Sequence, residues 1–189
     1  TCVLAASQYR DNGAILLVDI IRATAKLRPS IKFIAFDRFA DDETRAEVIN
    51  ALLDPQVSSR YSLLPEATPA EVHQVLSEAT IGLALDLPTS RRIHALPVKL
   101  FEYMAAGLPI VASDLPKSRE VLVDAECGIL VEPGAVEVYV DAILRLVDDR
   151  PLAERIGQLG QRAFRSRYSW QGEVQPVLEL YRRLLLARG

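Results

Sequence analysis

The sequence has little cysteine, no long apolar run and no excess of basic residues. Its two cysteines, Cys2 and Cys127, are too few for a disulfide framework or a cysteine-rich zinc site. The longest uninterrupted apolar runs, residues 2–6 and 14–18, are far shorter than the roughly 20 residues that a membrane-spanning helix needs. The net charge of −3 argues against general nucleic-acid binding, which requires a basic surface.

Several motifs that carry cofactor chemistry are also missing. The chain has no glycine-rich dinucleotide fingerprint, no Walker-type phosphate loop and no cluster of residues with metal-ligand spacing. What remains is ordinary globular composition, with 50% hydrophobic and 25% charged residues. A length of 189 residues is enough for one domain with a full core.

The chain starts inside a pattern that is typical of a β-strand. Residues 1–6 form an apolar, strand-like run without an initiator methionine, and Met104 is the only methionine. Because a natural N-terminus rarely lies within a strand, we expect the chain to be a fragment of a longer protein.

Short apolar runs alternate with longer runs of helical period along the chain. The expected strands are residues 3–6, 31–36, 61–64, 81–85, 110–113 and 128–131. One expected helix follows Gly13, and another begins at Thr68. The other expected helices cover residues 41–53, 97–106, 118–123, 135–147, 151–166 and 172–186. This alternation predicts an α/β fold with a doubly wound parallel sheet and a helical C-terminal tail.

Candidate chemistry is concentrated in residues 96–113, which follow the fourth expected strand through a polar loop. Ligands of open α/β sheets bind beyond the carboxyl ends of the strands, and a helix N-terminus offers free amides to anionic oxygens. Lys99 and Glu102 are three residues apart and therefore share a face of the expected helix. A cation for phosphate beside a carboxylate for sugar hydroxyls suits a nucleotide sugar. The same spacing also allows the two side chains simply to pair with each other.

The run of residues 97–113 closely resembles the donor-site signature of group 1 (family 4) glycosyltransferases of the GT-B fold. Weaker matches follow in the family's order at residues 119–121, 127–134, 141–148 and 167–170. Such enzymes have two Rossmann-like domains that face each other across a cleft, and this chain resembles only the C-terminal, donor-binding one. The resemblance implies a Rossmann-like nucleotide-sugar-binding domain over residues 1–167. It also implies a C-terminal helix over residues 168–189 that packs back toward a missing N-terminal, acceptor-binding domain.

The resemblance implies roles for individual residues as well. Glu102 matches the glutamate that holds the ribose hydroxyls, and Leu64 matches the backbone position that reads the nucleobase. The diphosphate cradle maps to the loop and helix start, at Leu96, Pro97, Lys99 and Leu100. The backbone amides would bind the diphosphate there, and the Lys99 side chain would add a positive charge.

The sequence departs from the family pattern at two places on the donor side. The family often has a glutamate eight positions before the ribose-binding one; here that residue is His94, either a candidate catalytic residue or an ordinary loop histidine. After the first strand, Ser7 and Asn12 occupy positions where basic residues commonly contact phosphate. Arg10 between them is a candidate replacement, and so is the Arg91-Arg92 pair before His94.

The leading hypothesis is transfer of a sugar from a nucleoside-diphosphate sugar to a hydroxyl acceptor with retention of configuration, as the family implies. No cofactor or metal is expected, because a helix N-terminus and cations can stabilise the leaving diphosphate. A cytoplasmic enzyme is implied, with a peripheral membrane contact through the missing half, and this fragment alone is not expected to be active. Two alternatives stay open: a sugar-nucleotide epimerase-like domain, and a degenerate module that binds nucleotide or a partner without catalysis.

Overall fold

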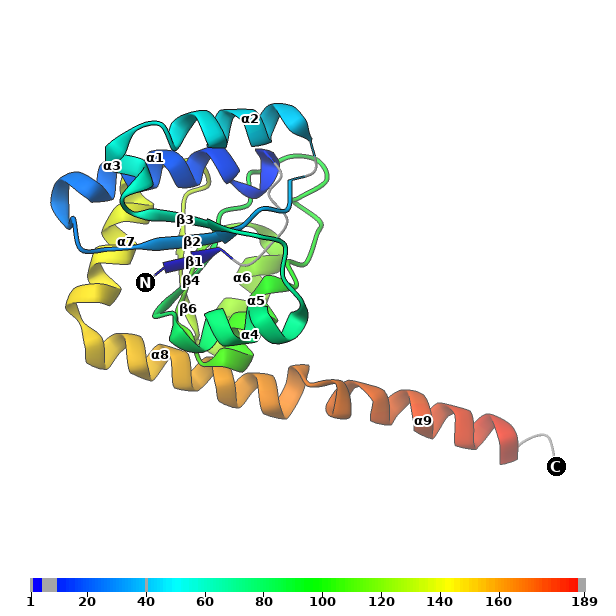
Figure 1. The fold of residues 1–189 in the computed structure, drawn as a ribbon. Helices are drawn as coiled ribbons and strands as arrows, with labels where there is room; N and C mark the ends of the chain where they lie inside the picture. The colour runs from blue at the N-terminus through cyan, green and yellow to red at the C-terminus, as the bar shows by residue number, and fades with distance from the viewer. Residues whose placement is uncertain (1, 5–9, 40, 187–189) are drawn as a thin grey trace.

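A computed structural model describes residues 2–4, 10–39 and 41–186 of the chain. Within this part, six parallel strands form one sheet with helices on both faces, as the sequence predicts (Figure 1). The strands are β1 (Cys2–Leu4), β2 (Phe33–Phe36), β3 (Tyr61–Leu64), β4 (Ile81–Ala84), β5 (Ile110–Ser113) and β6 (Gly128–Val131). Their order, β3-β2-β1-β4-β5-β6, is that of doubly wound nucleotide-binding folds.

The helices also follow the predicted order. They are α1 (Ala14–Leu27), α2 (Asp42–Ala51), α3 (Pro55–Ser58), α4 (Pro69–Glu78), α5 (Lys99–Ala106), α6 (Pro116–Ala125), α7 (Val136–Asp148), α8 (Arg150–Ala163) and α9 (Trp170–Leu186). A 3-10 turn, η1 (Arg10–Asn12), precedes α1, and a π-helical turn, η2 (Phe164–Tyr168), follows α8. The short helix α3 is the one that the sequence pattern did not indicate in the described part of the chain.

Local signals explain where several helices begin and end. The Thr68 hydroxyl accepts the amide of Glu71, and the Glu71 carboxylate accepts the Thr68 amide at 2.8 Å, so α4 starts with a complete capping box. The Asp41 carboxylate caps α2 by accepting the amide of Thr44 at 2.6 Å. Gly107 ends α5 in the left-handed region with φ of 73°, where glycine is favoured.

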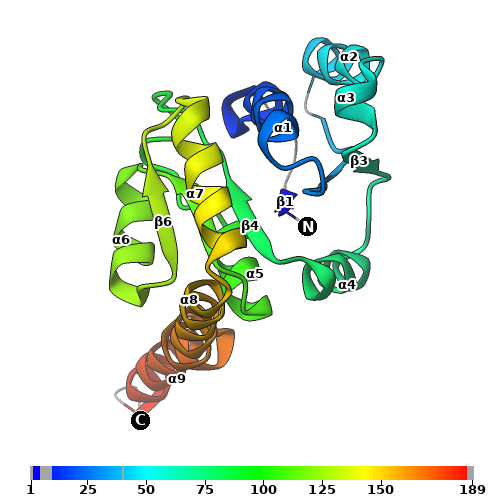
Figure 2. The same ribbon diagram turned by 90° about the vertical axis from the view of Figure 1, so that its left-hand side faces the viewer.

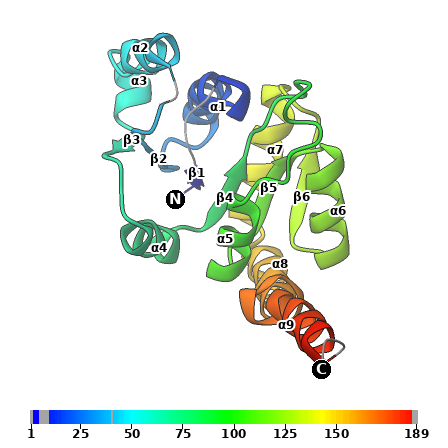
Figure 3. The same cartoon turned by 90° about the vertical axis from the view of Figure 1, so that its right-hand side faces the viewer.

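Different helices cover the two faces of the sheet. The helices α1, α2, α3 and α7 pack on one face, and α4, α5 and α6 pack on the other (Figures 2 and 3). Leu17 and Tyr139 are fully buried in the first core, and Tyr103 is fully buried in the second. Helix α8 contributes Ile156 to the first core and Ala163 to the second, so it links the two layers.

The last helix, α9, lies apart from these layers. Figure 1 shows it continuing beyond α8 and extending away from the sheet. Trp170, Tyr181 and Leu185 are 75%, 62% and 72% exposed. The packing of residues 168–189 against another domain and the boundary at residue 167 stay predictions. None of the described helices combines the length and hydropathy that crossing a bilayer requires.

Gly157 in α8 packs directly on the end of α5. A Cβ atom at this position would overlap the backbone carbonyl of Gly107, which cannot move aside as a side chain can. We therefore expect Gly157→Ala to lower the free energy of unfolding in urea by about 1–3 kcal/mol through overpacking. The control is Gln158→Ala on the exposed side of the same helix, which should change it by less than about 0.5 kcal/mol. Equal effects of the two substitutions would contradict the packing argument.

Candidate functional site

The crevice beyond the carboxyl ends of β1 and β4 is the expected ligand site, because the strand order reverses between these two strands. The turn η1 and the loop after β4 meet there, since the amide of Leu87 donates to the carbonyl of Asp11 at 2.8 Å. Gly13, with φ of 81°, lies so close to Leu85 that a Cβ atom would overlap the Leu85 carbonyl. Glycine therefore allows α1 to begin directly against the end of β4.

The start of α5 presents backbone amides without an acceptor. Within the described residues, no acceptor is recorded for the amides of Leu96, Val98 and Lys99, and no side chain caps the helix. Pro97 has no N–H group, and Leu100 already donates its amide to the Pro97 carbonyl at 3.1 Å. The amides of Leu96, Val98 and Lys99 are therefore open to a ligand, whereas Pro97 has no amide proton and the Leu100 amide already has an acceptor. The diphosphate cradle itself stays a prediction.

The Lys99 side chain is buried rather than exposed to the crevice. It is 5% exposed, and its ammonium group lies 3.2 Å from the carboxylate of Asp86, whose side chain is 2% exposed. Burial lowers the pKa of Lys99, and the Asp86 carboxylate opposes that shift. The structure thus pairs Lys99 with Asp86 rather than with Glu102, and it leaves the Lys99 amide as the group available at the helix start.

Two arginines of the same loop extend this pair into a network of charges. Arg91 contacts the Asp11 carboxylate at 2.7 and 2.8 Å. Arg92, with its side chain 15% exposed, lies 3.4 Å from Asp11 and 3.5 Å from Asp86. Burial works against ionisation of Asp11, but the two arginines hold its pKa below the usual range. The candidate cations Arg91 and Arg92 therefore lie at the crevice, in contact with carboxylates.

Glu102 lies in the first turn of α5 and is half-buried. It lines a cavity of about 150 Å³ between α4 and α5, together with His73 and Ser77. Burial raises the pKa of the Glu102 carboxyl, and the positive charges of His73, Lys99 and Arg38 oppose the rise. A partly desolvated carboxylate is suited to accept hydrogen bonds from neighbouring hydroxyl groups.

The described side chains of the other predicted site residues do not take part in this network of charges. His94 is exposed in a turn of the loop after β4. Leu64 ends β3, and its carbonyl accepts the amide of Asp37 at 2.6 Å, so one backbone acceptor of this position is already in use. Arg10 opens η1, but its side chain is not described, and Ser7 lies outside the described residues. In the described ranges, no group of three or more His, Cys, Asp or Glu side chains could hold a metal ion.

The sequence patterns did not indicate Asp86 and Asp11. Asp86 comes just after the buried strand β4, and an acidic residue at the carboxyl end of a central strand is a usable signal. Asp11 offered no comparable signal, because its partner Arg91 is 80 positions away in the chain. Only the folded chain brings these residues together.

The sequence matches a known family over most of its length: the profile of "Glycosyl transferases group 1" covers residues 10–163. The chain belongs to the group 1 glycosyl transferases. It is 40% identical over 84 residues to a phosphatidyl-myo-inositol mannosyltransferase of Mycobacterium leprae. The matched region is 44% of this chain and 22% of that protein. The chain spans less than half the length of the curated relatives that it matches.

Solved structures share the fold of this glycosyl transferase chain. Anabaena HepE in complex with UDP superposes with a TM-score of 0.83 at 16% identity, over 96% of this chain and 48% of that chain. The C-terminal domain of a group 1 family glycosyl transferase (LpcC) from Francisella tularensis superposes with a TM-score of 0.69 at 19% identity, over 89% of this chain and 86% of that one. These similarities confirm the predicted Rossmann-like fold of GT-B type.

A double-mutant cycle tests the buried pair of Asp86 and Lys99. Removal of one partner leaves the other charge buried, so Asp86→Asn and Lys99→Met should each lower the free energy of unfolding by about 3–5 kcal/mol. The double variant should lose less than the sum, because the two charges are removed together. Urea unfolding of the four proteins measures the coupling, and strictly additive losses would show that the two groups do not interact.

Glu102 should lower stability at neutral pH. Burial raises the pKa of the Glu102 carboxyl in the folded protein. The folded state therefore binds the proton of this carboxyl group more tightly than the unfolded chain does. Its favourable contribution is present at low pH and is lost as the pH rises through the folded-state pKa. Glu102→Gln should therefore raise the thermal midpoint more at about pH 7 than at about pH 4. Glu78→Gln, at an exposed position of α4, is the control, and a pH-independent effect of Glu102→Gln would contradict the argument.

Proposed function

We propose that this chain is the donor-binding half of a retaining glycosyltransferase and binds a nucleoside-diphosphate sugar. The observation that carries the proposal is the start of α5, where the amides of Leu96, Val98 and Lys99 have no acceptor among the described residues and Glu102 lies in the first turn. Family membership supports it, and so does the relative named as a mannosyltransferase. The structural relative HepE, crystallised with UDP and with UDP-glucose, supports a nucleotide sugar as the ligand class.

The proposed chemistry is departure of a nucleoside diphosphate from the anomeric carbon of the sugar. As the bond from that carbon to the phosphate oxygen breaks, negative charge grows on the diphosphate. The amides of Leu96, Val98 and Lys99, which have no acceptor among the described residues, would donate to it, and each such donor contributes roughly 3 kcal/mol in comparable sites. The network beside the cradle contains three cations, Arg91, Arg92 and Lys99, and two carboxylates, Asp11 and Asp86. These five side chains together carry one net positive charge.

The remaining roles follow from the same proposal. Glu102 would accept the two ribose hydroxyls, and the backbone of Leu64 would contact the base. His94, exposed in the loop after β4, is the candidate residue for the sugar itself. The acceptor site would lie on an N-terminal domain outside this chain, so the chain would bind donor without transferring sugar. A metal-independent enzyme in the cytoplasm, with membrane contact through that other domain, completes the proposal.

Titration calorimetry of the 189-residue chain with UDP, GDP and ADP tests the donor site. We expect at least one of these nucleotides to bind, and we expect EDTA to leave the affinity unchanged. Glu102→Gln should weaken this binding about tenfold or more, because hydrogen bonds to a charged acceptor contribute about 1.5–3 kcal/mol.

Two substitutions away from the crevice serve as controls for this titration. Glu78→Gln removes an exposed carboxylate near the end of α4, and Trp170→Phe changes an exposed side chain of α9, so neither should alter the affinity. A folded chain that binds none of the three nucleotides would overturn the donor site and favour the degenerate module. Equal losses in Glu102→Gln and the controls would show that stability, rather than recognition, was measured.

A further inference from the structure

Strand β6 has one open edge. It pairs with β5 on one side, and no strand in the described part of the chain pairs with the other. The carbonyls of Cys127 and Val131 point toward β5, where they accept the amides of Ile110 and of the residue after β5. Because successive residues of a strand direct their backbone groups to opposite sides, Gly128 and Leu130 direct their N–H and C=O groups to the open edge.

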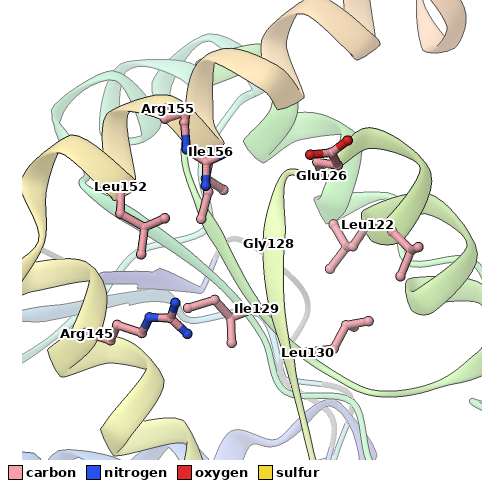
Figure 4. A pocket seen from close by; sticks show the side chains of 10 residues that line it. Leu122, Glu126, Gly128, Ile129, Leu130, Arg145, Leu152, Arg155 and Ile156 are labelled. Atoms are coloured by element: carbon pink, nitrogen blue, oxygen red, sulfur yellow. The ribbon is translucent and has the colours of Figure 1, made fainter.

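A groove of about 410 Å³ follows this edge (Figure 4). Helix α6 lines one side of it, and α7 and α8 line the other. The side chains of β6 alternate between the two faces of the sheet. Leu130 packs with the core under α6, and Ile129 packs with the core under α7. The groove is therefore centred on the backbone of the open edge, with one wall on each face of the sheet.

The two walls of the groove differ in charge. Arg145 of α7 and Arg155 of α8 are exposed on one wall, and neither side chain forms an ion pair or a hydrogen bond with the described residues. Figure 4 shows the Arg145 side chain reaching toward Ile129. The α6 wall carries the apolar side chains of Leu122 and Val123, and the exposed carboxylate of Glu126 lines the groove where α6 ends. An occupant that is acidic toward the two arginines and apolar toward α6 would match both walls, with its acidic side chains on the face away from Glu126.

We propose that the groove binds an extended, acidic peptide segment of a partner protein, which adds a strand beside β6. Side chains of an added strand alternate between the two faces of the sheet. Acidic residues at every second position would meet Arg145 and Arg155, and the apolar residues between them would meet the α6 wall. Main-chain bonds to Gly128 and Leu130 would supply affinity, as in other cases of strand addition. The four residues of β6 include no proline and no charged residue that would block this edge.

A fluorescein-labelled peptide of sequence Val-Glu-Val-Glu-Val-Glu tests the proposal by fluorescence anisotropy. It should bind the 189-residue chain with a dissociation constant below about 1 mM. Arg145→Glu and Arg155→Glu should each weaken binding about tenfold or more, because each places a like charge against the peptide. Arg162→Glu, which changes an exposed arginine of α8 outside the groove, is the matched control and should leave binding unchanged.

Modified peptides separate strand addition from simple charge attraction. Val-Lys-Val-Lys-Val-Lys should not bind, and the same residues in blocks, Val-Val-Val-Glu-Glu-Glu, should bind more weakly than the alternating peptide. Two further peptides carry N-methyl groups, one on all three valine amides and the other on all three glutamate amides. Only alternate amides of an added strand face β6, so one of these peptides should lose binding and the other should keep it.

Four results would overturn the proposal. The first is absence of binding up to about 1 mM peptide. The second is equal binding by both methylated peptides and the parent peptide. The third is an equal loss of affinity in Arg162→Glu and the groove variants. The fourth is a dimer in sedimentation experiments that is abolished by Arg145→Glu, because a second copy of the chain would then occupy the edge.

Discussion

At the carboxyl end of β4, the Asp86 carboxylate faces the Lys99 ammonium at 3.2 Å with both side chains almost fully buried. Either charge alone would be strongly destabilising in this position, so the two residues fold as a unit. Asp86 follows the strand and Lys99 begins α5, and the pair therefore fixes where the helix starts relative to the sheet. A buried ion pair adds little net stability over an apolar pair of similar size. Its contribution here is the position of the Leu96, Val98 and Lys99 amides.

The charges around that pair form a connected network. Arg91 and Arg92 both contact the Asp11 carboxylate, and the Leu87 amide donates to the Asp11 carbonyl in η1. Donors that are oriented by the fold need no reorganisation when negative charge develops nearby, which is the condition under which such groups are most effective. Glu102 works in the opposite direction on stability, because burial disfavours its charged carboxylate and raises its pKa.

Much of the fold could be predicted because its signals are local. Strands β3, β5 and β6 have the predicted bounds, and the Thr68 capping box marks the start of α4. Helix α3 has only four residues, too few for a periodic pattern to reveal it. Helical spacing points to Glu102 as the partner of Lys99. The actual partner is Asp86, which lies at the other end of an irregular loop and could not be predicted from that spacing. The family resemblance implied that the Leu100 amide belongs to the cradle, and no sequence pattern indicated that this amide donates to the Pro97 carbonyl.

The crevice beyond β1 and β4 and the β6 groove lie at different boundaries of the same sheet. The crevice is at the ends of β1 and β4, where irregular loops can present backbone groups to a small anion. The groove is at the side of the sheet, where a regular strand presents alternating backbone groups to another extended chain. Helix α8 supplies Arg155 to the groove, and its Gly157 packs against Gly107, which ends α5 on the side away from the crevice. The contact is made by the two backbones and leaves no room for a side chain at position 157, so the helix that borders the groove is packed directly on the helix whose start borders the crevice.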